Sequence, residues 1–409
     1  MPPAATGATI TPERRSGVWA KGRMRYKIAM IWVRIAGVVG ASLLAVVMSA
    51  QLALGEPPVI PFGRGSQGHV VIPVTVNGEA GYAVLDNGAG TSVIDRGFAV
   101  GLGLISPGTK AIFNRAGGSP VRRKAVIRVG DAEEKVKAGV MDLRPLSDTS
   151  GKHIIAVVGE EFFEDRIVEI DFSTQTVIFR DRNTFAPPAG ASPIALKSAD
   201  SAKARISLTL EGSIVEAVLD LGASYTLAIP RGATAKRWVA EGRPWTEQFS
   251  GSVHGDQLRS SANRLMTARS VTIGGLSLTD VPADVLSQKW LVAPSGAGIG
   301  VNLLSRFDLT FDIKGKRVWM TPNETAREPF RYMVGGLSWD GLGSGEAMIH
   351  TVYRNSPAEK AGLKAGDVVV RVNGEAPTRE IVTRFEPGQV VELELEDGSQ
   401  RRLTAERFY

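Results

Sequence analysis

The chain has 409 residues, with 48 Lys and Arg, 42 Asp and Glu, 46 glycines and no cysteine. This length accommodates two or three domains, and ordinary fractions of hydrophobic (43%) and charged (22%) residues exclude a collagen-like or largely disordered chain. The lack of cysteine excludes disulfides, thiolate nucleophiles, iron–sulfur clusters and cysteine-ligated zinc.

Residues 1–55 carry the entire net charge of +6, because they hold seven basic residues and one acidic residue. An uncharged apolar stretch from Ile35 to Gly55 follows the basic part, as in a secretory signal peptide, although its 21 residues could also span a bilayer. We expect residues 1–55 to be a signal peptide or an N-terminal anchor, the second involving residues 28–55. The body is then exported to a bacterial periplasm or the periplasmic face of the inner membrane. Because that body is neutral, we expect no nucleic-acid partner.

The next part of the chain contains the same pattern twice: a strand, a turn, a second strand and an Asp-x-Gly-Ala turn. The paired segments are Gly68–Gly78 with Ala83–Ala89, and Ala204–Gly212 with Ala217–Ala223. Further on, Gly159 and Gly300 each precede a strand aspartate by 12 residues, Asp171 and Asp312. We predict a duplicated, hairpin-rich β unit with lobe 1 at 66–182, a turn-rich linker at 183–202 and lobe 2 at 203–322.

The pattern changes from about residue 330. A strand at 347–353 precedes a short Ser-capped helix at 356–363, and a further strand ends on the turn Asn373-Gly374. We therefore predict a third, small α+β domain at 330–405.

Each Asp-x-Gly-Ala turn places a carboxylate, Asp86 or Asp220, at the end of an apolar strand. Such an aspartate often only caps its own turn. Two copies at matched positions favour a second interpretation, in which an approximate two-fold axis brings both carboxylates together. A carboxylate pair can activate water and protonate a leaving amine.

On these residues the chain resembles the bacterial retropepsin-like aspartic proteases, over roughly residues 68–322. The resemblance implies a bilobal β-barrel aspartic-protease fold and an aspartic-type endopeptidase with Asp86 and Asp220 as catalytic residues. It also implies hairpin flaps near 114–118 and 251–255, with polypeptide substrates bound by a further set of residues. That set is Gly88, Gly222, Gly117, Gly118, His254 and Gly255.

The chain departs from this family directly after each aspartate. The family has Thr or Ser there, whose hydroxyl braces the two loops, whereas this chain has Asn87 and Leu221. A catalytically inactive, protease-like peptide-binding protein or scaffold is therefore the alternative.

The C-terminal unit resembles bacterial PDZ domains through Ser356–Leu363, Gly366-Asp367 and Val372–Gly374. The resemblance implies a groove for a C-terminal peptide, with backbone amides that hold the terminal carboxylate. We assign these amides to Gly335, Gly336 and Leu337. The four histidines show no metal-ligand spacing, so we expect no metal and no cofactor.

Overall fold

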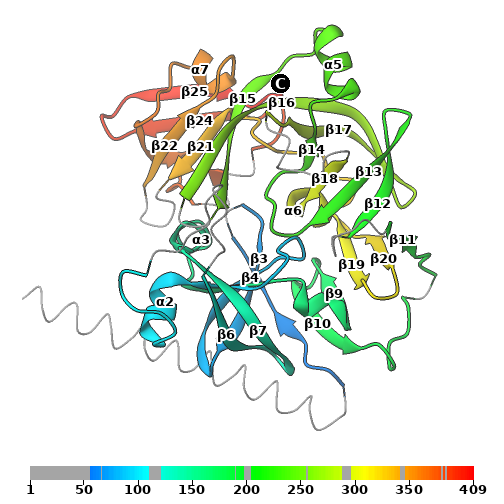
Figure 1. The fold of residues 1–409 in the computed structure, drawn as a ribbon. Coiled ribbons are helices and arrows are strands. Elements are labelled where there is room, and N and C mark those ends of the chain that lie inside the picture. Colours follow the sequence, from blue (N-terminus) through cyan, green and yellow to red (C-terminus); the bar gives the residue numbers. More distant parts are fainter. Residues whose placement is uncertain are drawn as a thin grey trace, which may run out of the picture. The chain divides into compact units, whose positions relative to one another are not determined.

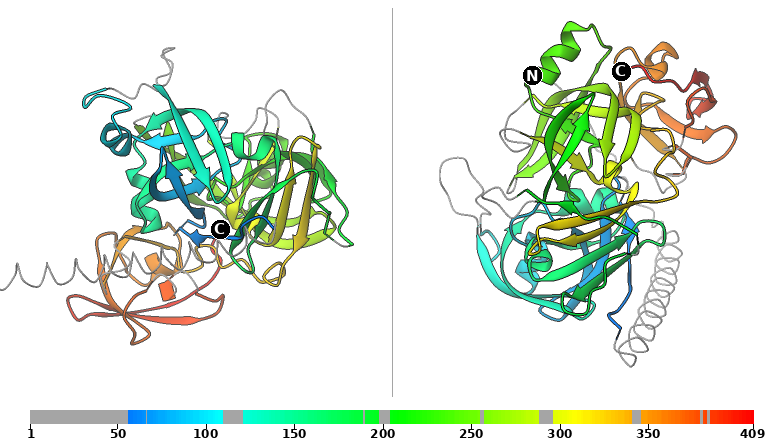
Figure 2. Two further views of the ribbon diagram at one scale, coloured as in Figure 1. Left: turned by 90° about the horizontal axis from the view of Figure 1, so that it is seen from below. Right: turned by 90° about the vertical axis from the view of Figure 1, so that its right-hand side faces the viewer.

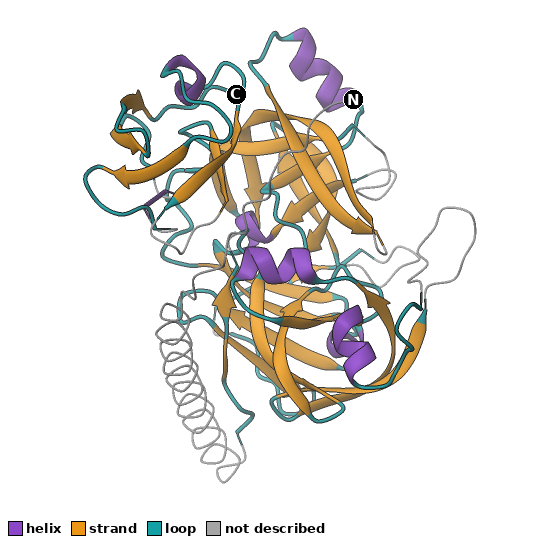
Figure 3. Cartoon of the chain, turned by 90° about the vertical axis from the view of Figure 1, so that its left-hand side faces the viewer, coloured by secondary structure: helices purple, strands orange, loops and turns teal. Residues whose placement is uncertain are grey.

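The computed structural model describes residues 56–409 except for short segments at 66, 110–120, 189, 198–203, 255–256, 288–295, 341–345, 379–380 and 383–384. The predicted leader, residues 1–55, lies outside the described residues. Residues Val59–Tyr409 form one compact unit that consists mainly of β-strands (Figures 1 and 3). No helix in the described part of the chain is both long and apolar enough to cross a membrane.

Lobe 1 is a closed barrel. Its sheet has the order β2-β3-β4-β8-β5-β7-β6, and β3 also pairs with β6, which closes a ring of six strands. The strands are β2 (Gly63–Arg64), β3 (Val70–Val76), β4 (Glu79–Leu85), β5 (Val93–Asp95), β6 (Arg122–Val129), β7 (Ala132–Met141) and β8 (Ile154–Val158). The short helices are α2 (Arg96–Gly101), α3 (Arg144–Ser150) and α4 (Glu161–Glu164).

Lobe 2 repeats this arrangement. Its sheet has the order β12-β13-β18-β14-β17-β16-β15, and the pairing of β12 with β16 closes the second ring. The strands are β12 (Arg205–Leu210), β13 (Ser213–Asp220), β14 (Leu227–Ile229), β15 (Thr246–His254), β16 (Gln257–Ile273), β17 (Leu276–Val285) and β18 (Ala297–Gly300). Its helices are α5 (Ala233–Ala240) and α6 (Val301–Leu304). Alternate residues of β12 fill the barrel, as the period of two in the sequence predicts.

A third sheet joins the two lobes, with the order β1-β10-β9-β19-β20-β11 (Figures 1 and 2). It contains β1 (Ile60–Pro61), β9 (Arg166–Asp171), β10 (Thr176–Asp181), β11 (Ile194–Ala195), β19 (Phe307–Asp312) and β20 (Arg317–Pro322). At its centre β9 of lobe 1 pairs antiparallel with β19 of lobe 2, with Ile170 opposite Leu309. Antiparallel pairing of equivalent strands is what an approximate two-fold axis between the copies produces. The prediction of a mainly β protein with two tandem barrel lobes is confirmed.

The C-terminal domain has its own five-stranded sheet, in chain order from β21 to β25. The elements are β21 (Leu337–Asp340), β22 (Ala347–Val352), α7 (Pro357–Lys360), β23 (Val368–Val372), β24 (Val390–Leu395) and β25 (Gln400–Thr404). The α7 helix begins where the sequence predicts, because the Ser356 hydroxyl accepts a hydrogen bond from the Glu359 amide at 3.1 Å.

Candidate functional site

The two Asp-x-Gly-Ala turns occupy equivalent places in the two barrels. Strand β4 leads into Asp86 and pairs in parallel with β8, while β13 ends at Asp220 and pairs in parallel with β18. Both aspartates are half-buried. Each strand therefore delivers its carboxylate to the same end of its barrel.

The structure brings these two turns together. A Cβ atom added at Gly88 would lie 2.5 Å from Oδ1 of Asp220, and one added at Gly222 would lie 2.2 Å from Cγ of Asp86. Each carboxyl group thus occupies the space beside the glycine of the opposite turn. Only glycine allows this approach.

Each aspartate also accepts hydrogen bonds within its own turn. Oδ1 of Asp86 accepts from the amides of Gly88 and Ala89 at 2.8 and 3.1 Å, and Oδ1 of Asp220 accepts from the Gly222 amide at 3.1 Å. These contacts are those of an Asx turn. The Asp-x-Gly pattern therefore has a structural role in both lobes.

Asn87 connects the two turns behind the aspartates. Its side-chain amide donates to the Leu219 carbonyl at 2.8 Å, and its Oδ1 accepts from the Leu221 amide at 2.9 Å. Asn87 is buried, so both bonds lie away from solvent. One side chain of lobe 1 thus replaces the two hydroxyl groups that the resemblance led us to expect.

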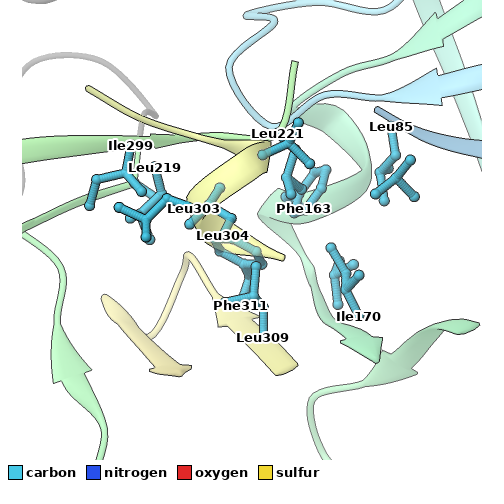
Figure 4. Packing of buried hydrophobic residues seen from close by; sticks show 14 of the residues in the cluster. Leu85, Phe163, Ile170, Leu219, Leu221, Ile299, Leu303, Leu304, Leu309 and Phe311 are labelled. Carbon is cyan, nitrogen blue, oxygen red and sulfur yellow. The ribbon is translucent and has the colours of Figure 1, made fainter. Parts of the chain in front are cut away.

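Leu221 has a different role from the hydroxyl residue of the family. Its side chain is 0% exposed and belongs to the large apolar cluster that also contains Leu85 and Phe163 of lobe 1 (Figure 4). The lobe 2 turn is therefore fixed by packing and by its backbone amide.

His69 and Tyr225 also adjoin the turns, and the sequence analysis assigned no role to either. Nε2 of buried His69 lies 3.1 Å from the Gly222 carbonyl; burial lowers the His69 pKa, and this hydrogen bond opposes the change. Desolvation raises the pKa of Tyr225 well above its ordinary value, with the charges of Asp220, Asp284 and Asp86 adding to the effect. No motif marks these residues, because lone His and Tyr side chains carry no recognisable spacing.

The predicted flaps are described only in part. Gly117 and Gly118 lie outside the described residues, as does Gly255. In lobe 2, β15 and β16 form a hairpin in which His254 pairs with Gln257, directly beside the tip. Binding of polypeptide by these residues stays a prediction.

The predicted carboxylate-binding loop leads into β21. Gly336 has φ +72°, and a Cβ added there would lie 2.1 Å from Cβ of Ser356, the residue that caps α7. A Cβ at Gly335 would lie 2.9 Å from the Phe385 ring, and Leu337 is buried in the domain core. Packing therefore requires both glycines, whatever their part in peptide binding.

The described residues contain no cluster of three or more His, Cys, Asp or Glu side chains arranged to hold a metal ion.

Comparison with known proteins identifies the C-terminal unit as a PDZ domain, because residues 348–406 match that family. The chain is also 30% identical over 198 aligned residues to the serine protease Do-like HtrB of Bacillus subtilis (strain 168). This match covers 41% of the chain and 42% of the relative, so the chain spans well under half of the relative's length. Together with the two closed barrels of the structure, the PDZ match confirms the predicted order of two barrel lobes followed by a PDZ domain.

The same comparison corrects the predicted reaction. The relative is named a serine protease, which contradicts the expectation of an aspartic-type, retropepsin-like endopeptidase that uses an Asp86–Asp220 dyad. The sequence pattern was misleading for a physical reason. An Asp-x-Gly turn has a structural function of its own, and in this chain Asn87 and Leu221 join the two turns by a buried amide and by packing.

Proposed function

We propose that this chain is a polypeptide-binding protein whose PDZ domain captures an extended peptide along strand β21. The observation that carries the proposal is the position of β21 at the edge of the five-stranded sheet, where β22 is its partner on one side. An edge strand presents unpaired backbone N–H and C=O groups, and PDZ domains bind peptides by adding a strand to such an edge.

The loop before β21 supports the same function. Met333 to Gly336 form a tight turn, in which the Gly336 amide donates to the Met333 carbonyl at 2.8 Å. This turn sits at the beginning of the open strand, where the end of an added peptide strand would lie. Because the Gly336 amide is already engaged with Met333, we propose that the amides of Gly335 and Leu337 hold the terminal carboxylate of the peptide, with Gly336 shaping the turn.

We propose a second peptide contact at the joined aspartate turns. Asp86 and Asp220 present two half-buried carboxyl groups side by side, and a carboxylate offers several acceptor positions to peptide N–H groups. Gly88 and Gly222 leave room for this arrangement. We further propose that the protein acts after export, in the periplasm or at its membrane face, because a basic segment precedes the apolar stretch within residues 28–55.

Peptide binding to the full chain tests the first contact. We expect free-acid peptides to bind at least about tenfold more tightly than the same peptides with an amidated C-terminus, because amidation removes the carboxylate charge. N-methylation of alternate peptide amides should weaken binding by a similar factor, because it blocks strand pairing. Fluorescence anisotropy gives both affinities, and equal binding of all three peptide forms would contradict the proposal.

A matched pair of glycine variants localises this contact. Gly335→Ala should weaken peptide binding, because its methyl group meets the Phe385 ring. Gly63→Ala in lobe 1 is the control, since a Cβ there meets no atom within 4 Å. Thermal midpoints of both variants show whether the domain stays folded.

The second contact is tested with a peptide blocked at both termini, which cannot use a carboxylate loop. Asp86→Asn and Asp220→Asn should each weaken its binding, whereas Asp165→Asn, on an exposed side chain, should not. Unchanged affinity in both site variants would remove the aspartates from the binding function.

Hydrolysis of the bound polypeptide by a serine nucleophile is a second candidate, favoured by the name of the relative. A fluorophosphonate probe should then label the protein covalently and abolish cleavage of casein. Absence of labelling, or cleavage that survives the probe, would contradict this candidate and leave peptide binding unaffected.

A further inference from the structure

Asp284 is a buried acid in lobe 2 that the proposed function does not use. It lies near the end of β17, is 2% exposed, and its Oδ1 has no hydrogen-bond partner in the described structure. Its neighbours Ala283 and Val285 belong to the barrel core. Because side chains alternate along a strand, Asp284 points to the outer face of the barrel.

Asp284 interacts electrostatically with four tyrosine side chains, three of which lie in or next to the PDZ domain. Its charge raises the pKa values of four phenols: Tyr225 in the lobe 2 turn, Tyr332 before β21, Tyr353 after β22 and Tyr409. Desolvation is the larger cause for each phenol, so all four stay neutral at ordinary pH. Asp284 therefore lies among neutral groups where lobe 2 meets the PDZ domain.

Hydrogen bonds join lobe 2 to the chain around the PDZ domain at this contact. The Gln248 amide of β15 donates to the Tyr332 hydroxyl at 2.5 Å, and the Thr267 hydroxyl of β16 donates to the Tyr409 carbonyl at 2.9 Å. The Thr246 hydroxyl donates to the Arg354 carbonyl at 3.3 Å. In Figure 1, β15 and β16 accordingly run beside β21 and β22. Oε1 of Gln248 is a second buried acceptor without a partner in the described structure.

The charged groups around the contact give Asp284 little compensation. Arg407, which interacts with Tyr409, forms an ion pair with Asp280 at 3.3 Å. Asp220 and Asp86, which also act on Tyr225, carry charges of the same sign as that of Asp284. Within the described part of the chain, an ionised Asp284 would thus be a buried charge without a matched cation, which is costly.

We propose that Asp284 makes the attachment of the PDZ domain to lobe 2 depend on protonation: the neutral carboxyl group keeps the domain attached, and ionisation releases it. The proposal stands independently of the peptide-binding function.

The direction of the pH effect follows from the environment of the acid. Burial raises the pKa of Asp284 from its ordinary 3.8 to about 7. With the domain released, the acid becomes accessible to water and returns toward the ordinary value. The attached state therefore binds one proton more than the released state between these two pH values. Attachment is strongest below the lower value, weakens as pH rises through this window, and changes no further above about 7.

Energy transfer between two dyes measures the attachment directly. The chain has no cysteine, so Ser213→Cys at the exposed start of β13 and Gln400→Cys in β25 give two unique labelling sites in the full chain. We expect transfer efficiency to fall as pH rises from about 5 to about 8. In Asp284→Asn, which cannot ionise, transfer should stay high over the whole range.

Two further variants make the test decisive. Asp397→Asn, in an exposed PDZ hairpin, should keep the wild-type pH profile. Gln248→Glu adds a second buried acid to the contact, so release should occur at lower pH. Thermal midpoints confirm that each variant folds. Transfer that is independent of pH in the wild type, or a wild-type profile in Asp284→Asn, would overturn the proposal.

Discussion

Asn87 shows how one residue can set the junction between two lobes. Its amide group satisfies the Leu219 carbonyl and the Leu221 amide at once, and all three groups are buried. The side-chain amide can do so because it carries its donor and its acceptor on two separate atoms.

We predict that Asn87→Ala lowers the free energy of unfolding by about 2 to 4 kcal/mol. The variant leaves one buried carbonyl and one buried amide without a partner, each at a cost of about 1 to 3 kcal/mol. Urea unfolding measures the loss, with Asn183→Ala on an exposed turn as the control. A loss equal to that of the control would show that water replaces the Asn87 side chain.

Leu221 gives a second prediction, opposite to what the aspartic-protease resemblance suggests. Leu221→Thr should lower the thermal midpoint, because it removes apolar volume and buries a hydroxyl group among apolar side chains. We expect a loss of about 1 to 3 kcal/mol in unfolding free energy. Leu221→Met, which conserves volume, is the control and should cost less. A stabilising Leu221→Thr would mean that the hydroxyl finds a partner in the opposite turn.

At the scale of elements, helix α5 is attached to its barrel through one carboxylate. Glu211, in the turn between β12 and β13, accepts bonds from Arg243 at 2.6 and 2.9 Å and from Trp238 at 3.0 Å. The Arg269 amide adds a further bond at 2.8 Å. Burial acts to raise the pKa of Glu211, but the hydrogen bonds, led by those from Arg243, outweigh it and lower the pKa to about 2.

This arrangement predicts an acid-dependent difference between the wild type and Glu211→Gln. The depressed pKa means that the carboxylate contributes stability above its ordinary value of 4.5, and that this contribution is lost as pH falls toward about 2. At neutral pH the variant should be less stable by about 1.5 to 3 kcal/mol, the range for a hydrogen bond to a charged group. Urea unfolding at several pH values should show the gap closing in acid. Glu216→Gln, at an exposed pair with Lys197, should show almost no gap at any pH.

At the scale of the whole molecule, Arg306 organises the chain between lobe 2 and the PDZ domain. It is 8% exposed, its guanidinium lies 3.8 Å from the Phe330 ring centroid, and burial lowers its pKa to about 10. Its guanidinium donates to four carbonyls, at distances of 2.5 to 3.2 Å: those of Thr325, Ala326, Glu328 and Pro329. One buried cation from α6's C-terminal flank thus holds the whole connecting segment.

We predict that Arg306→Ala opens this segment locally while both barrels stay folded. Tryptic cleavage at Arg327 and Arg331 should become at least about tenfold faster, since the loss of one charge-assisted bond already corresponds to more than 1.4 kcal/mol. Arg371→Ala, on an exposed PDZ side chain, should leave the rate unchanged. Equal cleavage rates in both variants would mean that packing of Phe330 alone holds the segment.

Much of the architecture could be predicted from the sequence, because it depends on local and repeated patterns. The period of two in β3 and β12, the matched Asp-x-Gly turns and the capping Ser356 each report on a few neighbouring residues. Repetition of the first two also predicted two similar lobes. These patterns remain readable without a partner, since each arises from the geometry of a strand, a turn or a helix end.

Only the tertiary structure could show the contacts between segments that are distant in sequence. The bonds of Asn87 to lobe 2, the position of His69 beside Gly222 and the burial of Asp284 at the PDZ contact all join residues that no local pattern relates. The reaction class could not be predicted from the aspartate turns either, because the same Asp-x-Gly turn satisfies its own backbone whether or not it meets a substrate. Hydrogen bonding within a turn is local and leaves a sequence signature, whereas burial and partner choice depend on how the folded lobes pack.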